Sequence, residues 1–301
     1  MIEAGLLTQQ ELPALAALWS RALPAGACPL TAAELTEYVL LHGGEPRAIL
    51  AVDPQGWLVA RGEGHLLGFA HCTVGRLPED DAETLRGVLR ALVLAPDAPA
   101  ATYQILLRAA AHYFGQQRAL SNILAFHLHT GYPRLNHGRG TVQQDDWALM
   151  TALGEAGYRL TQRWLFYRRD FSDMIEEPLP DVPGLSLRWQ ASVPEQFTLS
   201  AWAGPELAAR AQFMLFPQPP TCPAEPGASL FDLQVMPKYQ QRHMGRWLLA
   251  RGVNHLIARG ITHLFEAVPH DASRMQERLR ALNFTESSQR GYSYEQDPLH
   301  S

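Results

Sequence analysis

Lysine is nearly absent from this chain. Lys238 is the only one, and all other members of its 25 Lys and Arg residues are arginine. Acidic residues number 30, so the formal net charge at pH 7 is −5. Proteins that bind nucleic acid usually carry a strongly basic face. The charge balance therefore argues against nucleic acid as a partner.

Cysteine and long apolar runs are also scarce. The three cysteines, Cys28, Cys72 and Cys222, are odd in number and far apart, so they indicate neither a disulfide framework nor a metal site. No run of about 18 apolar residues is present to span a bilayer, and the N-terminus lacks the pattern of a signal peptide. We expect a soluble cytoplasmic protein that binds neither a membrane nor a metal ion.

The composition is that of a globular protein with room for two domains. The chain has 301 residues, of which 47% are hydrophobic, and a typical domain has about 100 to 150 residues. A segment rich in proline and acidic residues, Phe171 to Gly184, interrupts the apolar pattern near the middle. Such a composition is typical of a linker between domains.

The most informative segment is 230–249. The apolar run Leu230 to Val235 predicts a buried strand that ends before Pro237, and an apolar helix resumes at Trp247 after a polar loop. A strand–loop–helix junction directs backbone N–H groups and the positive end of the helix dipole to one point, where a pyrophosphate can bind. Gly245 would let such a group approach the backbone closely.

This junction resembles the acyl-CoA-binding motif of the GNAT acetyltransferases, which is Val-x-Pro-x-Tyr, then Gln/Arg-x-x-Gly-x-Gly/Ala and a leucine-rich helix. The matching residues, in order, are Val235, Pro237, Tyr239, Gln240, Gly245, Leu248 and Leu249. His243 replaces the first glycine of the motif, and its side chain would either crowd a phosphate or donate to it. The resemblance implies that acetyl-CoA, or another acyl-CoA, is bound by Leu233, Val235, Gln240, Gln241, Arg242, His243, Met244, Gly245 and Arg246.

The later part of the same scheme occurs twice in the chain. The segment Val93 to Pro96, followed by Leu106 and Leu107, parallels Val235 to Pro237 followed by Leu248 and Leu249. An internal repeat of this length indicates two similar domains. The order of the predicted elements also resembles the GNAT order, which is two helices, antiparallel strands, then helix, strand, helix, strand.

We therefore expect an α/β (α+β) fold with two tandem GNAT-like domains, each a mixed, mostly antiparallel twisted sheet flanked by helices. The predicted boundaries are 1–172 for the N-terminal domain, 173–184 for the linker and 185–301 for the C-terminal domain. Within the second half, helical material is expected around 194–216. That half would then lack two strands and depend on the first half to complete its sheet or its acceptor cleft.

The N-terminal copy of the phosphate loop, Pro96 to Leu107, has no glycine. Asp97 adds negative charge where a pyrophosphate needs positive potential, and Pro99 removes an N–H donor. Only the C-terminal domain is expected to bind the cofactor.

Acyl transfer to an amine requires removal of a proton from the amine and stabilisation of an oxyanion. The resemblance implies that the backbone N–H of Val235 supports the carbonyl oxygen and that a helix tyrosine protonates the thiolate. Leu279 and Leu153 stand at the tyrosine position in the two halves. The candidate bases are Asp232 and Glu266, because charged residues are rare in apolar strands; a position on a solvent-facing rim explains both equally well.

The acceptor is not identified by any motif. The turn-rich loop 131–140 and the aromatic residues Tyr292 and Tyr294 could line its cleft, or could be structural. The leading interpretation is an acetyl-CoA-dependent N-acetyltransferase that acts on a primary amine of a small molecule, as a monomer or homodimer. The alternative is a non-catalytic acyl-CoA sensor or scaffold built from a degenerate GNAT pair, which the missing tyrosines favour.

Overall fold

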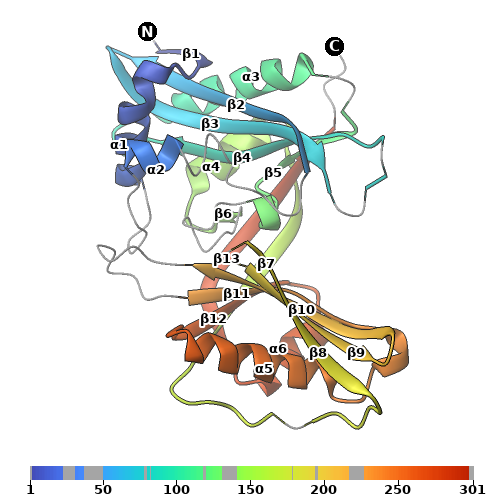
Figure 1. Ribbon diagram of the computed structural model, residues 1–301. Helices are drawn as coiled ribbons and strands as arrows, with labels where there is room; N and C mark the ends of the chain where they lie inside the picture. Colours follow the sequence, from blue (N-terminus) through green and yellow to red (C-terminus); the bar gives the residue numbers. More distant parts are fainter. Residues whose placement is uncertain are drawn as a thin grey trace. The chain divides into compact units, whose positions relative to one another are not determined.

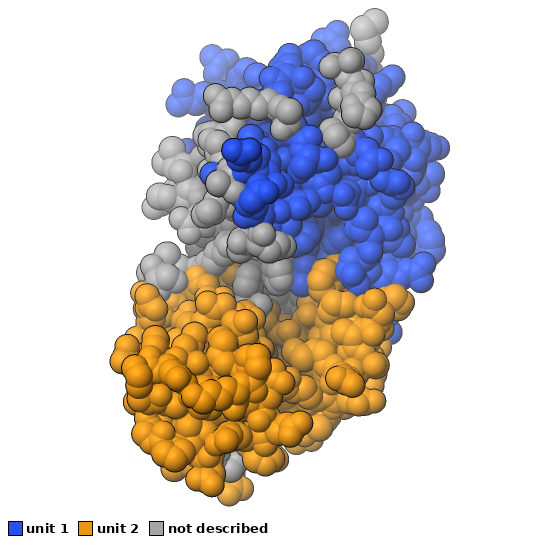
Figure 2. All heavy atoms as spheres, turned by 90° about the vertical axis from the view of Figure 1, so that its right-hand side faces the viewer, with its two compact units in different colours: residues 1–163, 289–301 blue, residues 164–288 orange. Residues whose placement is uncertain are grey.

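The computed structural model describes residues 2–22, 31–36, 50–77, 80–81, 83–117, 120–130, 141–177, 179–193, 196–216 and 227–297. Cys28, Cys222 and the predicted acceptor loop 131–140 lie outside these residues. The chain forms two compact units, residues 1–163 with 289–301, and residues 164–288, which Figure 2 shows in two colours.

The first unit contains a largely antiparallel sheet (Figure 1). Its strands are β1 (Ile2–Leu6), β2 (Leu50–Gly62), β3 (His65–Arg76), β4 (Arg86–Leu94), β5 (Asn122–Ala125) and β6 (Val142–Gln143). Neighbouring strands from β1 to β4 pair antiparallel, whereas β5 pairs parallel to β4. Continuous runs of side chains are buried along β3, β4 and β5. Because successive side chains of a strand point to opposite faces, both faces of the sheet are covered.

Helices cover both faces of this sheet. They are η1 (Gln9–Glu11), α1 (Leu12–Ala22), α2 (Ala32–Leu35), α3 (Ala101–Gly115), η3 (Leu128–Thr130) and α4 (Trp147–Glu155). Residues of α1 and α2 form one buried cluster with the sheet, and residues of α3 and α4 form another. A capping box begins the first helical segment, where the backbone N–H of Thr8 donates to Oε2 of Glu11 at 2.8 Å.

The second unit has a sheet with the order β7-β12-β11-β10-β9-β8. The strands are β7 (Arg159–Asp170), β8 (Leu185–Val193), β9 (Gln196–Ala203), β10 (Glu206–Phe216), β11 (Gly227–Val235) and β12 (His263–Pro269). The remaining elements are η5 (Pro237–Tyr239), α5 (Met244–Ala258), α6 (Ser273–Ala281) and β13 (Thr285–Gln296). Apolar residues of α5 and α6 pack on one face of the sheet and form a single core with it.

The structure contains the internal repeat that the sequence predicts. The series β4, α3, β5, α4 and β7 has the same order and types of element as β11, α5, β12, α6 and β13. The helices α3 and α5 each have 15 residues. A β-bulge adds one residue to β4 at Arg90 and to β11 at Phe231. The two halves therefore share a plan that extends to the irregular positions of their strands.

Two strands pass from one compact unit to the other. β7 follows α4 of the first unit, yet its residues 164–170 pair with β12. β13 follows α6 of the second unit, yet its later residues pair with β5 and β6. The first compact unit is therefore discontinuous in sequence, whereas the second is the single segment 164–288. The predicted domains 1–172 and 185–301 follow the repeat instead, and they remain a prediction.

The helical material predicted around 194–216 is wrong, because this segment forms the hairpin of β9 and β10. Phe197, Leu199 and Ala201 alternate with polar residues and face the core, and Gly204 turns the chain with a φ of 59°. Helix-favouring alanines in β10 obscured the period of two, and packing against α5 overrode their propensity. The prediction that the second half lacks two strands is therefore also wrong, because β9 and β10 are present.

Among the described residues, no helix is sufficiently long and apolar to cross a membrane. The same part of the chain has no group of three or more His, Cys, Asp or Glu residues that could hold a metal ion.

Candidate functional site

The parallel strands β11 and β12 separate in the middle of the second unit. They pair at Gly227 with His263, Ala228 with Leu264, and Ser229 with Phe265. Beyond these pairs, β11 remains bonded to β10 as far as Val235, and β12 remains bonded to β7 as far as Pro269. The bulge at Phe231 bends β11 just after the separation begins.

The separated edge of β11 presents backbone groups to a ligand. Met236 donates its N–H to the carbonyl of Ala208 in β10. Because successive residues of a strand direct their N–H groups to opposite edges, the N–H of Val235 points to the side where β12 has separated. The Val235 carbonyl accepts a hydrogen bond from Nε2 of Gln240 at 3.4 Å. An extended ligand could add main-chain hydrogen bonds along this edge.

The loop after β11 contains two residues in the left-handed region, Gln241 with a φ of 64° and His243 with a φ of 60°. The position of the first motif glycine therefore keeps the conformation that favours glycine, although histidine occupies it. Alternation of left-handed and right-handed residues gathers backbone N–H groups into a concave anion-binding nest. His243 is the N-cap of α5, and its carbonyl accepts the N–H of Trp247 at 3.0 Å.

The first turn of α5 supplies the remaining donors of the predicted cofactor site. Backbone N–H groups in the first turn have no partner within the helix, which applies here to Met244, Gly245 and Arg246. A Cβ atom added to Gly245 would be 3.4 Å from Cγ2 of Val235 and 3.9 Å from Cδ2 of Leu233. Leu233 and Val235 of β11 thus lie against the first turn of α5.

Sequence reasoning missed Arg278. A Cβ atom on Gly245 would be only 2.8 Å from Nη2 of Arg278, so this guanidinium lies over the start of α5. A cation at the positive end of a helix is unfavourable without an anion between them. Arg278 precedes Leu279 on α6, among Arg274 and Arg280; no local pattern distinguishes it from them, and only the packing of α6 against α5 identifies it.

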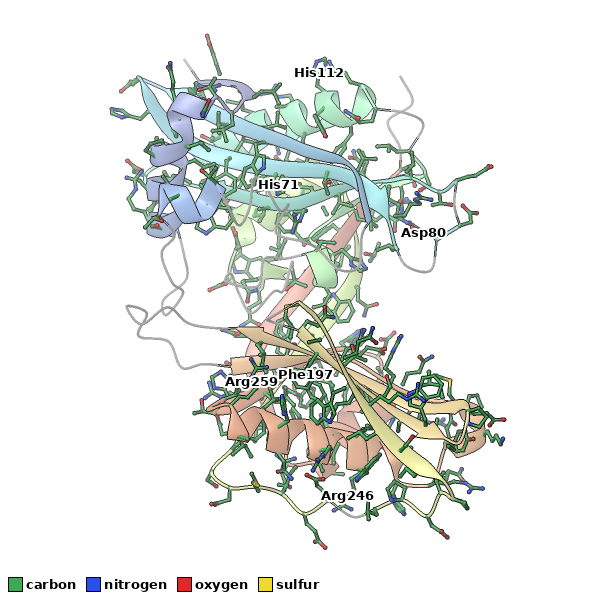
Figure 3. All side chains as sticks on the ribbon, in the orientation of Figure 1. His71, Asp80, His112, Phe197, Arg246 and Arg259 are labelled. Atoms are coloured by element: carbon green, nitrogen blue, oxygen red, sulfur yellow. The ribbon has the colours of Figure 1, made fainter. Side chains whose placement is uncertain are left out.

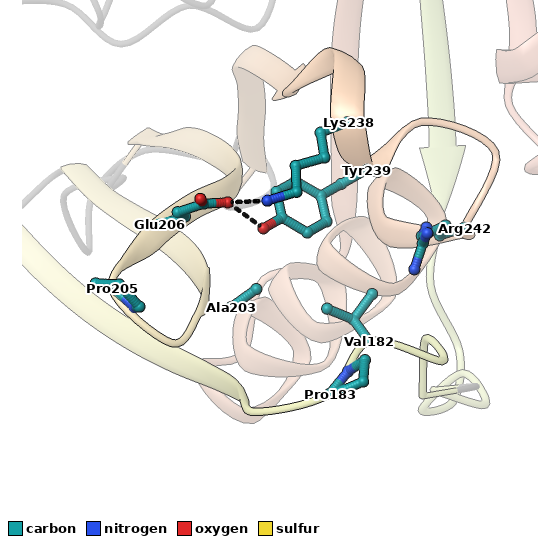
Figure 4. A pocket seen from close by; sticks show the side chains of 8 residues that line it. All are labelled: Val182, Pro183, Ala203, Pro205, Glu206, Lys238, Tyr239 and Arg242. Carbon is teal, nitrogen blue, oxygen red and sulfur yellow. Dashed lines mark hydrogen bonds and ion pairs between the residues drawn. The ribbon is translucent and has the colours of Figure 1, made fainter.

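Figure 4 shows a pocket beside the loop, with a volume of about 330 Å³. Lys238 and the hydroxyl of Tyr239 both donate to Oε2 of Glu206, at 2.5 Å and 2.7 Å. The carboxylate raises the pKa of Lys238. Tyr239 of the motif thereby anchors the loop to β10, and Lys238 is engaged with Glu206. Arg242 also lines the pocket but lies apart from this group.

The two predicted bases lie on opposite faces of the sheet. Glu266 lies between the core residues Leu264 and Val268 along β12, so it shares the face packed by α5 and α6, and it is only 8% exposed. It is also the first residue of β12 past the separation. Asp232 is on the other face of β11 and pairs with Nη2 of Arg210 at 2.9 Å. The structure does not bring these carboxylates together.

The leucines at the family's tyrosine position are structural. Leu279 is 1% exposed and Leu153 is fully buried, and each belongs to the apolar core of its unit. Neither can act as an acid. The aromatic residues Tyr292 and Tyr294 of β13 both pack with the core of the first unit.

The equivalent loop of the first unit has a different geometry. Between Ala95 and Ala101 no residue is left-handed, and the N-cap of α3, Ala100, is itself right-handed with no side-chain capping bond. Ala98 donates its N–H to Ala95, and Pro99 has no N–H to donate. The anion-binding conformation is therefore a feature of the second loop.

Residues 163–284 match the acetyltransferase (GNAT) family model. This segment is a GNAT-family domain. It contains the strand separation, the left-handed loop and both candidate bases. No match was found among curated proteins.

Solved structures of similar shape extend the comparison to the whole chain. A tandem GNAT protein from the clavulanic acid biosynthesis pathway gives a TM-score of 0.68 at 13% identity, covering 100% of this chain and 99% of its own. A GCN5-related N-acetyltransferase from Sphaerobacter thermophilus gives 0.61 at 12%, covering 98% and 95%. A glucosamine N-acetyltransferase region of a fungal multi-domain β-N-acetylglucosaminidase gives 0.67 at 14%, covering 98% and 38%.

These likenesses confirm the predicted fold, which is that of a tandem GNAT protein. The family match places an acetyltransferase (GNAT) domain at residues 163–284. The predicted roles of individual residues remain predictions.

Proposed function

We propose that the protein transfers an acetyl group from acetyl-CoA to a primary amine of a small molecule, and that the second unit binds the cofactor. The left-handed conformation of Gln241 and His243 at the start of α5 carries this proposal. Non-glycine residues in that conformation are uncommon, and a nest of N–H groups that can hold a phosphate gives the loop a reason to retain it.

The residues present fit CoA. The N–H groups of Met244, Gly245 and Arg246 would hold the pyrophosphate, and the guanidinium of Arg278 would add positive charge. The absence of a Cβ on Gly245 leaves the cradle between Arg278 and Val235 open to a phosphate oxygen. Bound acetyl-CoA would supply the acyl thioester. The backbone of β11 would orient it, with the Val235 N–H as donor to the developing oxyanion.

The two carboxylates have different parts in this proposal. A cofactor held by α5 and the Leu233–Val235 edge occupies the face of the sheet that also carries Glu266, so an amine would approach from the other face. Asp232 is on that other face, where Arg210 holds its carboxylate. Asp232 is therefore the better placed base for the amine, directly or through water, and Glu266 is placed to act on the side of the thioester.

Calorimetric titration with CoA tests the binding half of the proposal. Release of free thiol from acetyl-CoA, measured with a panel of small primary amines, tests the catalytic half. Failure of CoA to bind would contradict the proposal.

The burial of leucine in place of the family's tyrosine favours one alternative, a non-catalytic acyl-CoA sensor. A sensor would bind CoA with the same loop and release no thiol with any amine. Its affinity for CoA would instead change when a partner protein is bound. Thiol release with even one amine of the panel would reject the sensor.

A further inference from the structure

A second cavity lies between the first half of α5, the C-terminal end of α6 and the segment that follows β7. Its volume is about 150 Å³. Arg169 and Arg246 line it together with Glu176, Leu249 and Leu282. Pockets for whole drug-sized ligands have about 300 to 1,000 Å³. This cavity therefore suits one group of a larger ligand.

The cavity contains two arginine side chains, those of Arg169 and Arg246. Within the part of the chain that the structure describes, neither side chain forms an ion pair or a hydrogen bond. Partial burial lowers the pKa of Arg169. Arg169 is half-buried, whereas Arg246 is exposed to solvent. A half-buried guanidinium such as that of Arg169 normally has a carboxylate or another acceptor to offset its lost hydration. The exposed carboxylate of Glu176 also lines the cavity, which leaves one positive charge in excess.

Arg246 links this cavity to the phosphate loop. Its backbone N–H belongs to the first turn of α5, whereas its side chain lines the cavity; Figure 3 labels it near that end of the helix. Ala250, which also lines the cavity, is about 7.5 Å further along the axis than Gly245 at about 1.5 Å per residue. In CoA, a single ribose ring separates the pyrophosphate from the 3′-phosphate.

We infer that this cavity binds the 3′-phosphate of CoA through Arg169 and Arg246, and that it selects CoA over its 3′-dephosphorylated form. The inference rests on the proposed binding of CoA by the second unit. A phosphate monoester carries a charge of about −1.5 to −2 at pH 7, and the planar guanidinium of arginine matches phosphate oxygens in a two-point contact.

One structural role competes with this inference. Residues of the C-terminal end of α6 line the same cavity, and a cation near the carbonyl end of a helix stabilises it. Arg169 placed only for that purpose would contribute to stability but not to the choice of ligand. The two roles therefore predict different ratios of the affinities for CoA and 3′-dephospho-CoA. A purely stabilising role leaves this ratio unchanged.

The test is calorimetry with CoA and with 3′-dephospho-CoA on the full-length protein at a fixed ionic strength. We expect the unaltered protein to bind CoA at least about tenfold more tightly. Arg169→Gln and Arg246→Gln should each reduce this ratio about threefold or more, and the double variant should bring it close to one. Arg259→Gln is the matched control, because Arg259 follows the opposite end of α5 (Figure 3) and loses the same charge.

Each outcome decides. An unchanged ratio in both cavity variants, with CoA still bound, would overturn the 3′-phosphate site while leaving the proposed function intact. If Arg259→Gln reduced the affinity ratio as much as the cavity variants do, the effect would come from the net charge of the protein. That result would also overturn the 3′-phosphate site. If neither CoA nor 3′-dephospho-CoA bound to the unaltered protein, the proposed function itself would fail. Melting temperatures of all variants identify any loss that comes from unfolding.

Discussion

Arg278 and Gly245 meet at the start of α5, where a Cβ atom on Gly245 would lie 2.8 Å from Nη2 of Arg278. Two features that repel each other, an arginine and the positive end of a helix, are thus adjacent. An anion between them would be attracted by both. This juxtaposition makes each residue a direct probe of the proposed phosphate site.

Gly245→Asp should abolish detectable CoA binding. The new carboxylate would occupy the cradle, pair with Arg278 and repel the pyrophosphate. Ala100→Asp is the matched control, because it introduces the same side chain at the N-cap of α3, in the equivalent loop of the first unit. Calorimetry with CoA should show near-normal affinity for the control. Equal losses in the two variants would move the cofactor site or reject it.

Arg278→Gln should weaken CoA binding by about three- to tenfold, which is about 0.7–1.4 kcal/mol and within the usual net contribution of one hydrogen bond. Binding of acetyl-pantetheine, which lacks the pyrophosphate, should be unchanged. Arg274→Gln, one turn earlier on α6, serves as the control and should have no effect on either ligand. Equal weakening of both ligands by Arg278→Gln would assign Arg278 to packing against the pantetheine arm instead.

The sequence predicted the strand–loop–helix junction of β11 and α5 because its signals are local. Gly245 and the strand–loop–helix pattern lie within 20 consecutive residues, and the backbone alone determines how the N–H groups point. Arg278 could not be found in the same way, since its role depends on the packing of α6 against α5. The opposite faces of Asp232 and Glu266 follow from alternation along each strand, but the register between the strands was needed to compare them.

The fold was predicted less completely for a related reason. The repeat was visible because Val93 to Pro96 parallels Val235 to Pro237 in sequence. The passage of β7 and β13 between the compact units was not visible, because strand pairing with a distant segment leaves no local pattern. The hairpin of β9 and β10 was missed because Ala208, Ala209 and Ala211 favour helices in isolation and become strand residues only when they are buried against α5.

The stability of the first unit should depend on pH through Glu11. Its carboxylate accepts hydrogen bonds from Nε and Nη2 of Arg61 at 2.6 Å and 2.8 Å, and Arg61 is the main reason that the pKa of Glu11 is lowered to about 2. A carboxyl whose pKa is lower in the folded state stabilises the fold above its unfolded pKa. That contribution is lost as the pH falls from about 5 towards 2.

Glu11→Gln should therefore lower the free energy of unfolding by about 1–3 kcal/mol at pH 7, with a smaller difference from the unaltered protein at each lower pH. Denaturant titrations at pH 7, 5 and 3 measure it. Glu63→Gln, an exposed position in the turn after β2, should have little effect at any pH. A difference for Glu11→Gln that is constant with pH would show that charge is not its source.

Asp232→Asn and Glu266→Gln should separate the roles of the two carboxylates. Both changes keep the size of the side chain and remove its charge, and neither residue belongs to the phosphate loop, so CoA affinity should remain near normal in both. Removal of a general base lowers turnover by about a hundred- to ten-thousand-fold. We expect that loss in Asp232→Asn, with a change in the pH profile of turnover, because Asp232 is on the face from which the amine would approach.

The matched control is Arg210→Gln, which frees Asp232 from its ion pair without removing the carboxylate. This variant should alter the pH profile while retaining most of the turnover. A large loss in Glu266→Gln alone would transfer the role of base to Glu266, and near-normal turnover in both variants would mean that neither carboxylate takes the proton.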